Sequence, residues 1–295
     1  MPLFRRNHRQ PEEGAKPAAA ARGGSAASRP NDHDWRSYDG VAEVYARVHA
    51  PRTALPAGDL VEVTQILPGG RVLDVGTGTG VVARAAHDAG AGLVVGVDPS
   101  IPMLRQARQG GDGPRFAAAA AIDLPFRAGT FDAVLAAFAL SQFAKAETAL
   151  FDMVRVLRQG GRLGVSAWGP GKDDFSTAWS EVAEEFAEHE MLADAYTRAQ
   201  PGAERFSDGV RLKDTLHDAG LRDIRIDHRE YRFQMTAEEY LVGKETASSG
   251  RFLQQMLGDE YWETFRRRTR EVFAERFPPA FNDFRDVVLA AGHKA

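Results

Sequence analysis

The chain has 295 residues, of which 43% are hydrophobic and 26% are charged, a composition typical of globular proteins. Its net charge of −4 is uneven: residues 1–30 carry a net +4, so the remainder carries −8, which suits nucleic acid poorly because phosphates must be neutralised by Lys and Arg. The absence of cysteine excludes disulfides, thiolate metal sites and cysteine nucleophiles, and it is compatible with a reducing compartment.

Residues 1–34 are rich in Ala, Gly and Arg, a composition that predicts a disordered leader or tail. Residues 35–295 are expected to fold as one domain. No apolar run approaches the ~18–20 residues that cross a bilayer. We therefore expect a cytoplasmic protein with no membrane span and no nucleic-acid partner, whose oligomeric state the sequence leaves open.

Two helices are expected ahead of the first strand. Apolar and aromatic residues recur at three- and four-residue spacing from Tyr38 to His49, the stripe of an amphipathic helix that Pro51 ends. A second helix runs to Pro68. Five apolar runs separated by helical stretches follow, at 72–75, 93–98, 116–122, 131–140 and 163–168. This alternation is typical of a doubly wound parallel sheet in an α/β protein.

Beyond residue 168 the pattern changes to helices rich in aromatic residues. Helical insertions are expected at about 171–206 and 236–281, and Ser207 is expected to cap a helix that Gly220 ends. Strands are expected at 224–228 and 286–291. The chain shows no internal repeat and no second complete core. The aromatic residues are most simply the core of the inserted helices; alternatively, they wall an apolar ligand pocket above the sheet.

A glycine-rich loop follows the first strand. Asp74 lies in that strand, and Gly76, Gly78 and Gly80 occupy every second position before a helix expected over 81–88. Glycines permit backbone conformations closed to other residues and let a ligand approach the main chain. Asp98 ends the next strand, where its two oxygens can accept hydrogen bonds from both hydroxyls of an adenosine ribose. The loop and Asp98 therefore predict a nucleotide-like ligand.

Two cofactors fit these residues. A dinucleotide would place its pyrophosphate on the helix N-terminus, and Gly78-x-Gly80-x-x-Ala83 satisfies a loose form of that motif. S-adenosylmethionine has no phosphate and suits an acid near its amino group, where Asp74 lies. Both cofactors remain open on these residues alone.

Five segments carry a family resemblance: 72–80 (VLDVGTGTG), 96–104 (GVDPSIPML), 124–126 (LPF), 131–134 (FDAV) and 155–163 (RVLRQGGRL). Together they resemble the successive motifs of class I S-adenosylmethionine-dependent methyltransferases, most closely the ubiquinone/menaquinone C-methyltransferase-like, small-molecule branch. The resemblance covers about residues 38–168. It implies a seven-stranded, mostly parallel, Rossmann-like sheet with an antiparallel seventh strand and helical insertions that form a lid.

The resemblance also implies S-adenosyl-L-methionine as the cofactor and assigns residues to its parts. The methionine end would be held by Asp74, Gly76, Thr77, Gly78 and Gly80 and the ribose by Asp98. The adenine would be bordered by Pro99, Ser100, Met103, Ala121 and Ile122. Phe138 would approach the cofactor from the other side, and Tyr38 and Tyr45 are either core residues or part of a lid.

The chain departs from the family in two places. Relatives often carry an acid three residues before Asp123, where this chain has Ala120, and a histidine within 138–143, where it has none. No histidine pair has metal-ligand spacing, so no metal site is expected. No catalytic residue is assigned, because alignment of donor and acceptor alone can supply roughly 7–11 kcal/mol.

The expected function is S-adenosylmethionine-dependent methylation of a small, partly apolar molecule. One alternative is an S-adenosylmethionine-binding protein of the same fold with a non-methylating role. Another is a nicotinamide-dependent oxidoreductase, which differs in the cofactor that it binds.

Overall fold

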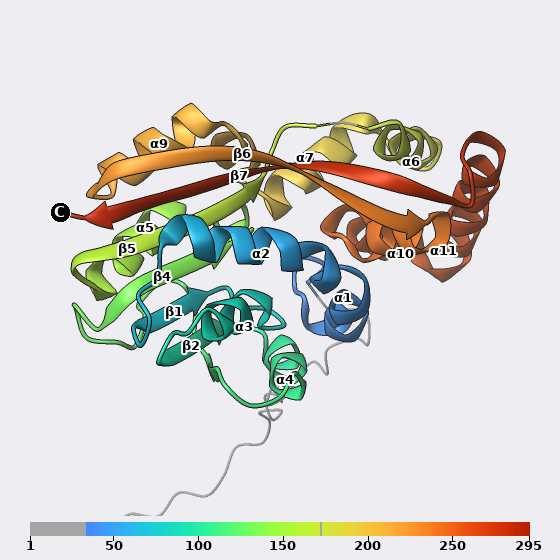
Figure 1. Cartoon of the computed structure of the whole chain (residues 1–295). Coiled ribbons are helices and arrows are strands. Elements are labelled where there is room, and N and C mark those ends of the chain that lie inside the picture. The colour runs from blue at the N-terminus through green and yellow to red at the C-terminus, as the bar shows by residue number, and fades with distance from the viewer. Residues whose placement is uncertain (1–33, 172) are drawn as a thin grey trace, which may run out of the picture. The chain divides into compact units, whose positions relative to one another are not determined.

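The computed structural model describes residues 34–171 and 173–295, so the expected leader, apart from Asp34, lies outside the described residues. Seven strands form one sheet: β1 Arg71–Val75, β2 Leu93–Asp98, β3 Arg115–Ala118, β4 Phe131–Ala137, β5 Leu157–Trp168, β6 Leu221–Thr236 and β7 Ala280–Lys294. The strand order is β3-β2-β1-β4-β5-β7-β6 (Figure 1). Strands β1–β5 are parallel, and β7 is antiparallel to both β5 and β6. The predicted seven-stranded, mostly parallel sheet is confirmed.

The helices fall into those that cover the sheet and those that extend beyond it. Two short 3-10 helices are η1 Asp39–Val41 and η2 Leu140–Gln142. Before the end of β5 the α-helices are α1 Ala42–Val48, α2 Ala50–Thr64, α3 Val81–Asp88, α4 Ile101–Gln109 and α5 Ala146–Val156. After β5 they are α6 Asp174–Glu184, α7 His189–Ala199, α8 Ala203–Ser207, α9 Gly209–Asp218, α10 Ala237–Thr246 and α11 Ser248–Arg276. The helix expected over 81–88 is confirmed as α3.

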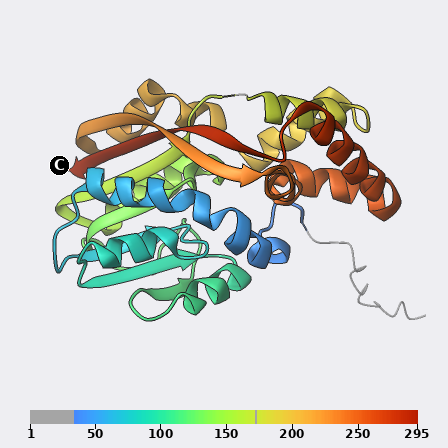
Figure 2. The same cartoon turned by 45° about the vertical axis from the view of Figure 1, so that its right-hand side comes forward.

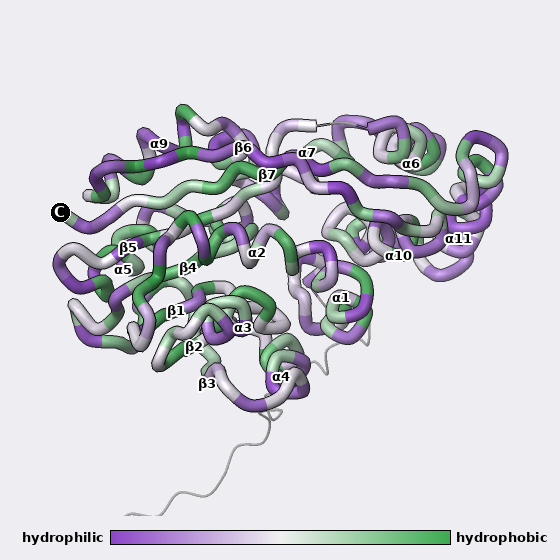
Figure 3. Tube along the Cα trace, viewed as in Figure 1, coloured by the Kyte–Doolittle hydropathy of each residue, from purple (hydrophilic) through white to green (hydrophobic). Residues whose placement is uncertain are grey.

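Side chains alternate across the strands and divide the core around the sheet into two layers. Leu73 and Val288 face the layer completed by α5 and α9, whereas Val72 and Leu289 face the layer completed by α2 and α3. Figure 3 shows the hydrophobic colour along β1, β4 and α2. Because the central strands are buried on both faces, their sequences are continuous apolar runs.

Strands β6 and β7 continue past β5 as a two-stranded ribbon toward α10 and α11 (Figures 1 and 2). Around the far end of this ribbon, α6, α10 and α11 enclose a third hydrophobic core that contains Trp179, Phe265 and Phe281. These helices belong to the same compact unit as the sheet. Aromatic residues from the two separate insertions meet in this cluster.

Several boundaries differ from those expected. The third apolar run leaves the sheet at Ala118 rather than at 122, and the chain turns at Asp123, whose φ is +59°. Helix α9 is capped by Asp208, not Ser207: an Asp208 carboxylate oxygen accepts hydrogen bonds from the backbone of Val210 and Arg211 at 2.8 and 3.1 Å. A carboxylate is the stronger acceptor for these amides.

The sequence predicts that the chain has no membrane span. Across 34–171 and 173–295, no helix combines the length and the apolar character needed to span a bilayer.

Candidate functional site

The loop between β1 and α3 is fixed to the neighbouring strand β2. The backbone nitrogens of Gly76 and Thr77 donate to the Val97 carbonyl at 2.9 and 3.0 Å. Gly76, Gly78 and Gly80 have φ values of +73°, +51° and +80°, which other residues rarely adopt. A Cβ atom on Gly76 or Gly80 would lie 2.8 Å from a neighbouring side chain, whereas one on Gly78 would meet open space. Gly78 is therefore the glycine that leaves room for a ligand.

Asp74 lies beneath this loop and is buried. One of its carboxylate oxygens accepts a hydrogen bond from the Thr77 hydroxyl at 2.6 Å. Burial raises the pKa of Asp74 to about 7, although the bond from Thr77 opposes the shift. Asp74 therefore acts on the site by holding the loop.

Asp98 joins the loop to the start of α4. Its Oδ2 accepts from the Gly78 nitrogen and its Oδ1 from the Ser100 nitrogen, both at 2.9 Å. Burial raises the pKa of Asp98, while these two bonds lower it. Ser100 caps α4, where its hydroxyl oxygen accepts a hydrogen bond from the Met103 nitrogen at 3.3 Å, and its hydroxyl donates to Asp39 at 2.6 Å. The carboxylates of Asp98 and Asp39 thus both lie at the N-terminus of α4.

A cleft of about 310 Å³ lies over the glycine loop. The predicted residues that line it are Tyr38, Tyr45, Gly76, Gly78, Asp98, Pro99, Ser100, Met103 and Phe138. The other predicted residues, Asp74, Thr77, Gly80, Ala121 and Ile122, do not line it. The first three of these support the loop, and the last two pack against the core layer of α5 because β3 ends before them.

Sequence reasoning missed further residues of the cleft wall: Arg36, Ser37, Asp39, Ala137, Ala139, Gln142 and Phe143. Those at 137–143 follow the end of β4, at the sheet edge where ligands bind, so their position could have indicated them. Those at 36–39 come from the segment before α1, which no motif marks.

The segment before α1 is attached to α11 by Arg251. The Arg251 Nε donates to the Trp35 carbonyl at 2.6 Å, and its guanidinium carbon lies 4.6 Å from the centre of the Tyr38 ring. Trp35 also packs edge-on against Phe252, with ring centres 5.3 Å apart. Tyr38 and Tyr45 pack against each other at 5.6 Å. These two tyrosines are partly buried and line the cleft.

A second cavity of about 280 Å³ adjoins the first, and Tyr38, Tyr45, Phe138 and Gln142 line both. Phe138 has a φ of +53°, an uncommon conformation for a bulky residue. Its ring stacks on Trp168, with centres 4.2 Å apart and planes 22° apart. Phe138 and Trp168 thus form an apolar part of the wall of the second cavity.

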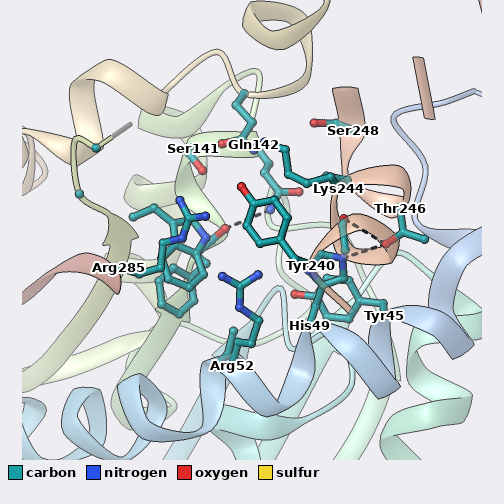
Figure 4. Close-up of a pocket in the computed structure, with 18 of the residues that line it drawn as sticks. Tyr45, His49, Arg52, Ser141, Gln142, Tyr240, Lys244, Thr246, Ser248 and Arg285 are labelled. Carbon is teal, nitrogen blue, oxygen red and sulfur yellow. Dashed lines mark hydrogen bonds between the residues drawn. The ribbon is translucent and has the colours of Figure 1, made fainter. Parts of the chain in front are cut away.

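Charged side chains also line the second cavity, Arg52, Lys244 and Arg285 among them (Figure 4). Asp283, a neighbour of the lining residues, is fully buried and pairs with Arg52 and Arg285. Arg285 also lies 3.0 Å from the Oδ2 of Asp173, and the other carboxylate oxygen, Oδ1, accepts a hydrogen bond from the Tyr240 hydroxyl at 3.5 Å. Of the aromatic residues in 175–196 and 240–284, only Tyr240 and Phe284 line this cavity. The others chiefly form the third core and the outer faces of the helices.

His49 and Lys244 complete this wall. The Nε2 of His49 lies 2.9 Å from the Thr246 hydroxyl, and burial lowers the His49 pKa to about 4, so the ring is neutral at physiological pH. Of the histidines in the described part of the chain, His49 alone lines either cavity. The Lys244 nitrogen lies 4.9 Å from the centre of the Trp179 ring, and burial lowers its pKa to about 8.

The side chains of the described residues do not form a group that could hold a metal ion. Within residues 34–171 and 173–295, no three His, Asp or Glu side chains are grouped as a metal site. The cleft instead offers backbone amides, carboxylates and apolar surface. This donor set fits an adenosine with a cationic amino-acid tail, because the carboxylates accept from hydroxyl and ammonium groups.

Comparison with known proteins agrees with the fold and the motifs. Residues 73–165 match the family model described as a methyltransferase domain. The chain is 45% identical over 105 residues to a demethylmenaquinone methyltransferase of Thermus thermophilus, covering 34% of this chain and 48% of that protein. It is 31% identical over 215 residues to a demethylmenaquinone methyltransferase of Mycolicibacterium gilvum, covering 66% of this chain and 89% of that protein.

A solved structure shows the same fold at low sequence identity. It is the Haemonchus contortus phosphoethanolamine N-methyltransferase 2 in complex with phosphomonomethylethanolamine and S-adenosylhomocysteine. The TM-score is 0.53 at 16% identity, over 90% of this chain and 61% of that one. The chain spans about half the length of the Thermus relative and most of the Mycolicibacterium relative. From its motifs, sheet order and these similarities, the chain belongs to the class I S-adenosylmethionine-dependent methyltransferases, in the branch of the menaquinone and ubiquinone C-methyltransferases.

Proposed function

We propose that this protein transfers a methyl group from S-adenosylmethionine, bound in the cleft over the glycine loop, to a small molecule in the adjoining cavity. The observation that best supports this is the shared wall of Tyr38, Tyr45, Phe138 and Gln142. Displacement at a methyl group requires the reacting atoms to approach in line to ~3–3.5 Å. Because the same four residues line both spaces, the cleft and the cavity adjoin, which a transfer between two bound ligands requires.

The cleft residues hold the donor side. S-adenosylmethionine supplies a methyl group on a positively charged sulfur when it is bound. Asp98 would accept hydrogen bonds from the ribose hydroxyls through the lone pairs that Gly78 and Ser100 do not use. Asp39 adds a second carboxylate to the cleft wall. Such a wall favours a cationic ligand over the pyrophosphate of a nicotinamide dinucleotide, because like charges repel.

The second cavity holds the acceptor. The curated relatives are named for demethylmenaquinone, so we propose a planar acceptor of the naphthoquinone type as the first to test. The stacked rings of Phe138 and Trp168 would support one face of such a ring system. Tyr38 and Tyr45 would exclude water from the shared wall, which strengthens the electrostatic interactions inside it.

The test begins with the cofactor. Calorimetry of the full chain with S-adenosylhomocysteine and, separately, with NAD⁺ should show binding of the first alone. Transfer of radiolabelled methyl groups is then measured on a panel of reduced naphthoquinones and related phenols. Binding of NAD⁺ instead would support the oxidoreductase, and S-adenosylhomocysteine binding without methylation of any panel member would support the non-methylating alternative.

A pair of glycine variants separates ligand binding from folding. Gly78→Ala and Gly160→Ala both place a side chain at positive φ, +51° and +70°, with open space around it. Their folding penalties should therefore be similar. Only Gly78 lines the cleft, so only Gly78→Ala should weaken S-adenosylhomocysteine binding, by about tenfold or more. Equal affinities for the two variants would place the ligand elsewhere.

A further inference from the structure

Most residues of the acceptor cavity lie outside the segment that matches the family model. Of its lining residues, only Phe138, Ser141 and Gln142 fall within residues 73–165. Its chemistry must therefore be inferred from this chain's own side chains. The charged groups of the wall are the most informative, because a charge removed from water needs a partner.

Most of these charges already have partners in the protein. Asp283 is shared by Arg52 and Arg285, and Asp173 lies beside Arg285. Asp286 lies 3.6 Å from the His228 imidazole. Arg52 and Arg285 are thus each paired with a carboxylate of the protein.

Lys244 is different. Among the described residues, no carboxylate oxygen lies within 4 Å of its ammonium nitrogen and no hydrogen bond from that nitrogen is formed, and the face of Trp179 is its close neighbour at 4.9 Å. Lys244 nevertheless lines the cavity, where Figure 4 shows it beside Tyr240 and above Arg52. Asp173 and Asp283 favour its charged form from a distance, but each of them is in an ion pair with Arg285, so within the described part of the chain Lys244 lines the cavity with no ion pair of its own.

We propose that the methyl acceptor is a planar conjugated molecule with an anionic oxygen group, and that this group pairs with Lys244. This inference rests on the proposed function and names its substrate class. The planar part would lie on the surface of Phe138 and Trp168, and the oxygen would reach the ammonium across the cavity. A carboxylate and an ionised phenol or enol share this chemistry, and the experiment distinguishes them.

The lowered pKa of Lys244 is consistent with this arrangement. Burial disfavours the ammonium form in the free protein and brings its pKa to about 8. An anion in the cavity would favour the ammonium again. The other charged or titratable groups that face Lys244 are Arg52, Arg285, Asp173, Asp283, His49 and Tyr240. Of the His and Lys side chains on this wall, His49 is already neutral above its pKa of about 4, which leaves Lys244 to titrate near pH 8.

The test measures binding rather than turnover. Full-length protein saturated with S-adenosylhomocysteine is titrated with 2-naphthoate and with 2-naphthamide, which share a shape and differ in charge. We expect 2-naphthoate to bind about ten- to hundredfold more tightly, the range for a hydrogen bond to a charged group. A third probe, 4-nitro-1-naphthol, reports its own ionisation by visible absorbance. Lowering of its apparent pKa on binding would identify the phenolate as an accepted source of the charge.

Three variants assign the effect to one side chain. Lys244→Met should remove the preference for 2-naphthoate and leave 2-naphthamide binding unchanged, whereas Lys244→Arg should retain it, because the charge remains. Lys213→Met, at an exposed lysine of α9, is the matched control and should behave as wild type. Affinity for 2-naphthoate should fall between pH 7 and 9 in the wild type but not in Lys244→Arg.

Three results would overturn the inference: equal affinity for the two naphthalenes, binding of neither, or a Lys244→Met variant with an intact preference. Each leaves the proposed function standing as long as S-adenosylhomocysteine binds. Loss of S-adenosylhomocysteine binding in the wild-type protein is the separate result that would contradict the proposed function itself.

Discussion

At the scale of single residues, the carboxylate oxygens of Asp98 are shared between the protein backbone and the proposed ligand. It accepts from the backbone of Gly78 and Ser100, which fixes the loop against α4. It also faces the cleft, where it would bind ribose hydroxyls. Because the protein amides occupy only part of its acceptor capacity, one carboxylate can organise the empty site and still contact the ligand.

Asp98→Ala should weaken binding of S-adenosylhomocysteine by one to two orders of magnitude. The physical reason is the loss of hydrogen bonds to a charged group, worth ~1.5–3 kcal/mol. Calorimetry measures the affinity, and circular dichroism verifies folding. Asp112→Ala, at an exposed loop position, is the control and should bind as wild type. Unchanged affinity in Asp98→Ala would contradict the placement of the ribose.

Asp74→Asn should change how stability depends on pH. The pKa of Asp74 is raised to about 7 in the folded protein, above its ordinary value of 3.8, so the folded state binds more protons between those values. Unfolding free energy should therefore fall as pH rises from 4 to 7, by up to about 1.4 kcal/mol per pH unit from this group. Urea unfolding at several pH values measures the slope, which Asp74→Asn should reduce. An identical slope in the variant would show that Asp74 ionises normally.

The residues of the cleft over the glycine loop were predictable where a motif follows a buried strand. Gly76, Gly78 and Asp98 lie at the ends of β1 and β2, so the apolar run itself indicates their position. Arg52 and Lys244 carry no such signal, because a charged residue on a helix is ordinarily solvated. Their burial depends on contacts between segments far apart in the chain, which local patterns do not reveal.

At the scale of elements, the sequence located those strands whose two faces are both buried. Strands β1, β2, β4 and β5 read as apolar runs, whereas the outer parts of β6 and β7 alternate charged and apolar residues and were predicted too short. Helix boundaries failed where a neighbouring residue was the better cap, as at Asp208. The lengths of the outer strands therefore depend on pairing between distant segments, whereas the central strands can be located from their local sequence pattern.

Helix α11 is interrupted at Gly258, whose backbone conformation excludes residues that carry a side chain. Gly258 has φ +70° and ψ 173°, a region that is accessible essentially to glycine alone. Gly258→Ala should lower the free energy of unfolding by about 1–3 kcal/mol. Gly58→Ala, at an exposed helical position in α2 with nothing within 4 Å, should instead raise it by about 0.5–1 kcal/mol. Denaturant unfolding measures both, and the same sign for both variants would contradict the backbone geometry given for Gly258.

At the scale of the whole molecule, α11 links two parts of the site that are distant in sequence. Arg251 is buried and contacts the backbone of Trp35 and the ring of Tyr38, so the segment that covers the cleft over the glycine loop rests on the helices that line the second cavity. The two cavities therefore depend on the same contacts.

Two truncations test this link. Removal of residues 1–33, whose composition predicts no packed core, should leave the melting temperature within about 1 °C of the full chain. Removal of residues 1–38 also deletes Trp35 and Tyr38, leaving Arg251 without two of its contacts. It should lower the melting temperature by roughly 3–8 °C and weaken S-adenosylhomocysteine binding. Scanning calorimetry distinguishes the two variants. Equal melting temperatures would show that the contacts of Arg251 with Trp35 and Tyr38 contribute nothing to stability.

The strand order has a consequence for biosynthesis. Strand β7 lies between β5 and β6, so the free edge of β5 has no neighbour until residues 280–294 have been translated. At about 5–20 residues per second, the stretch from Trp168 to Lys294 takes roughly 6–25 s to make. Throughout that interval the nascent chain exposes a long apolar strand edge, the kind that recruits chaperones or self-associates. A message cut short before β7 should accordingly yield aggregate rather than a smaller folded domain.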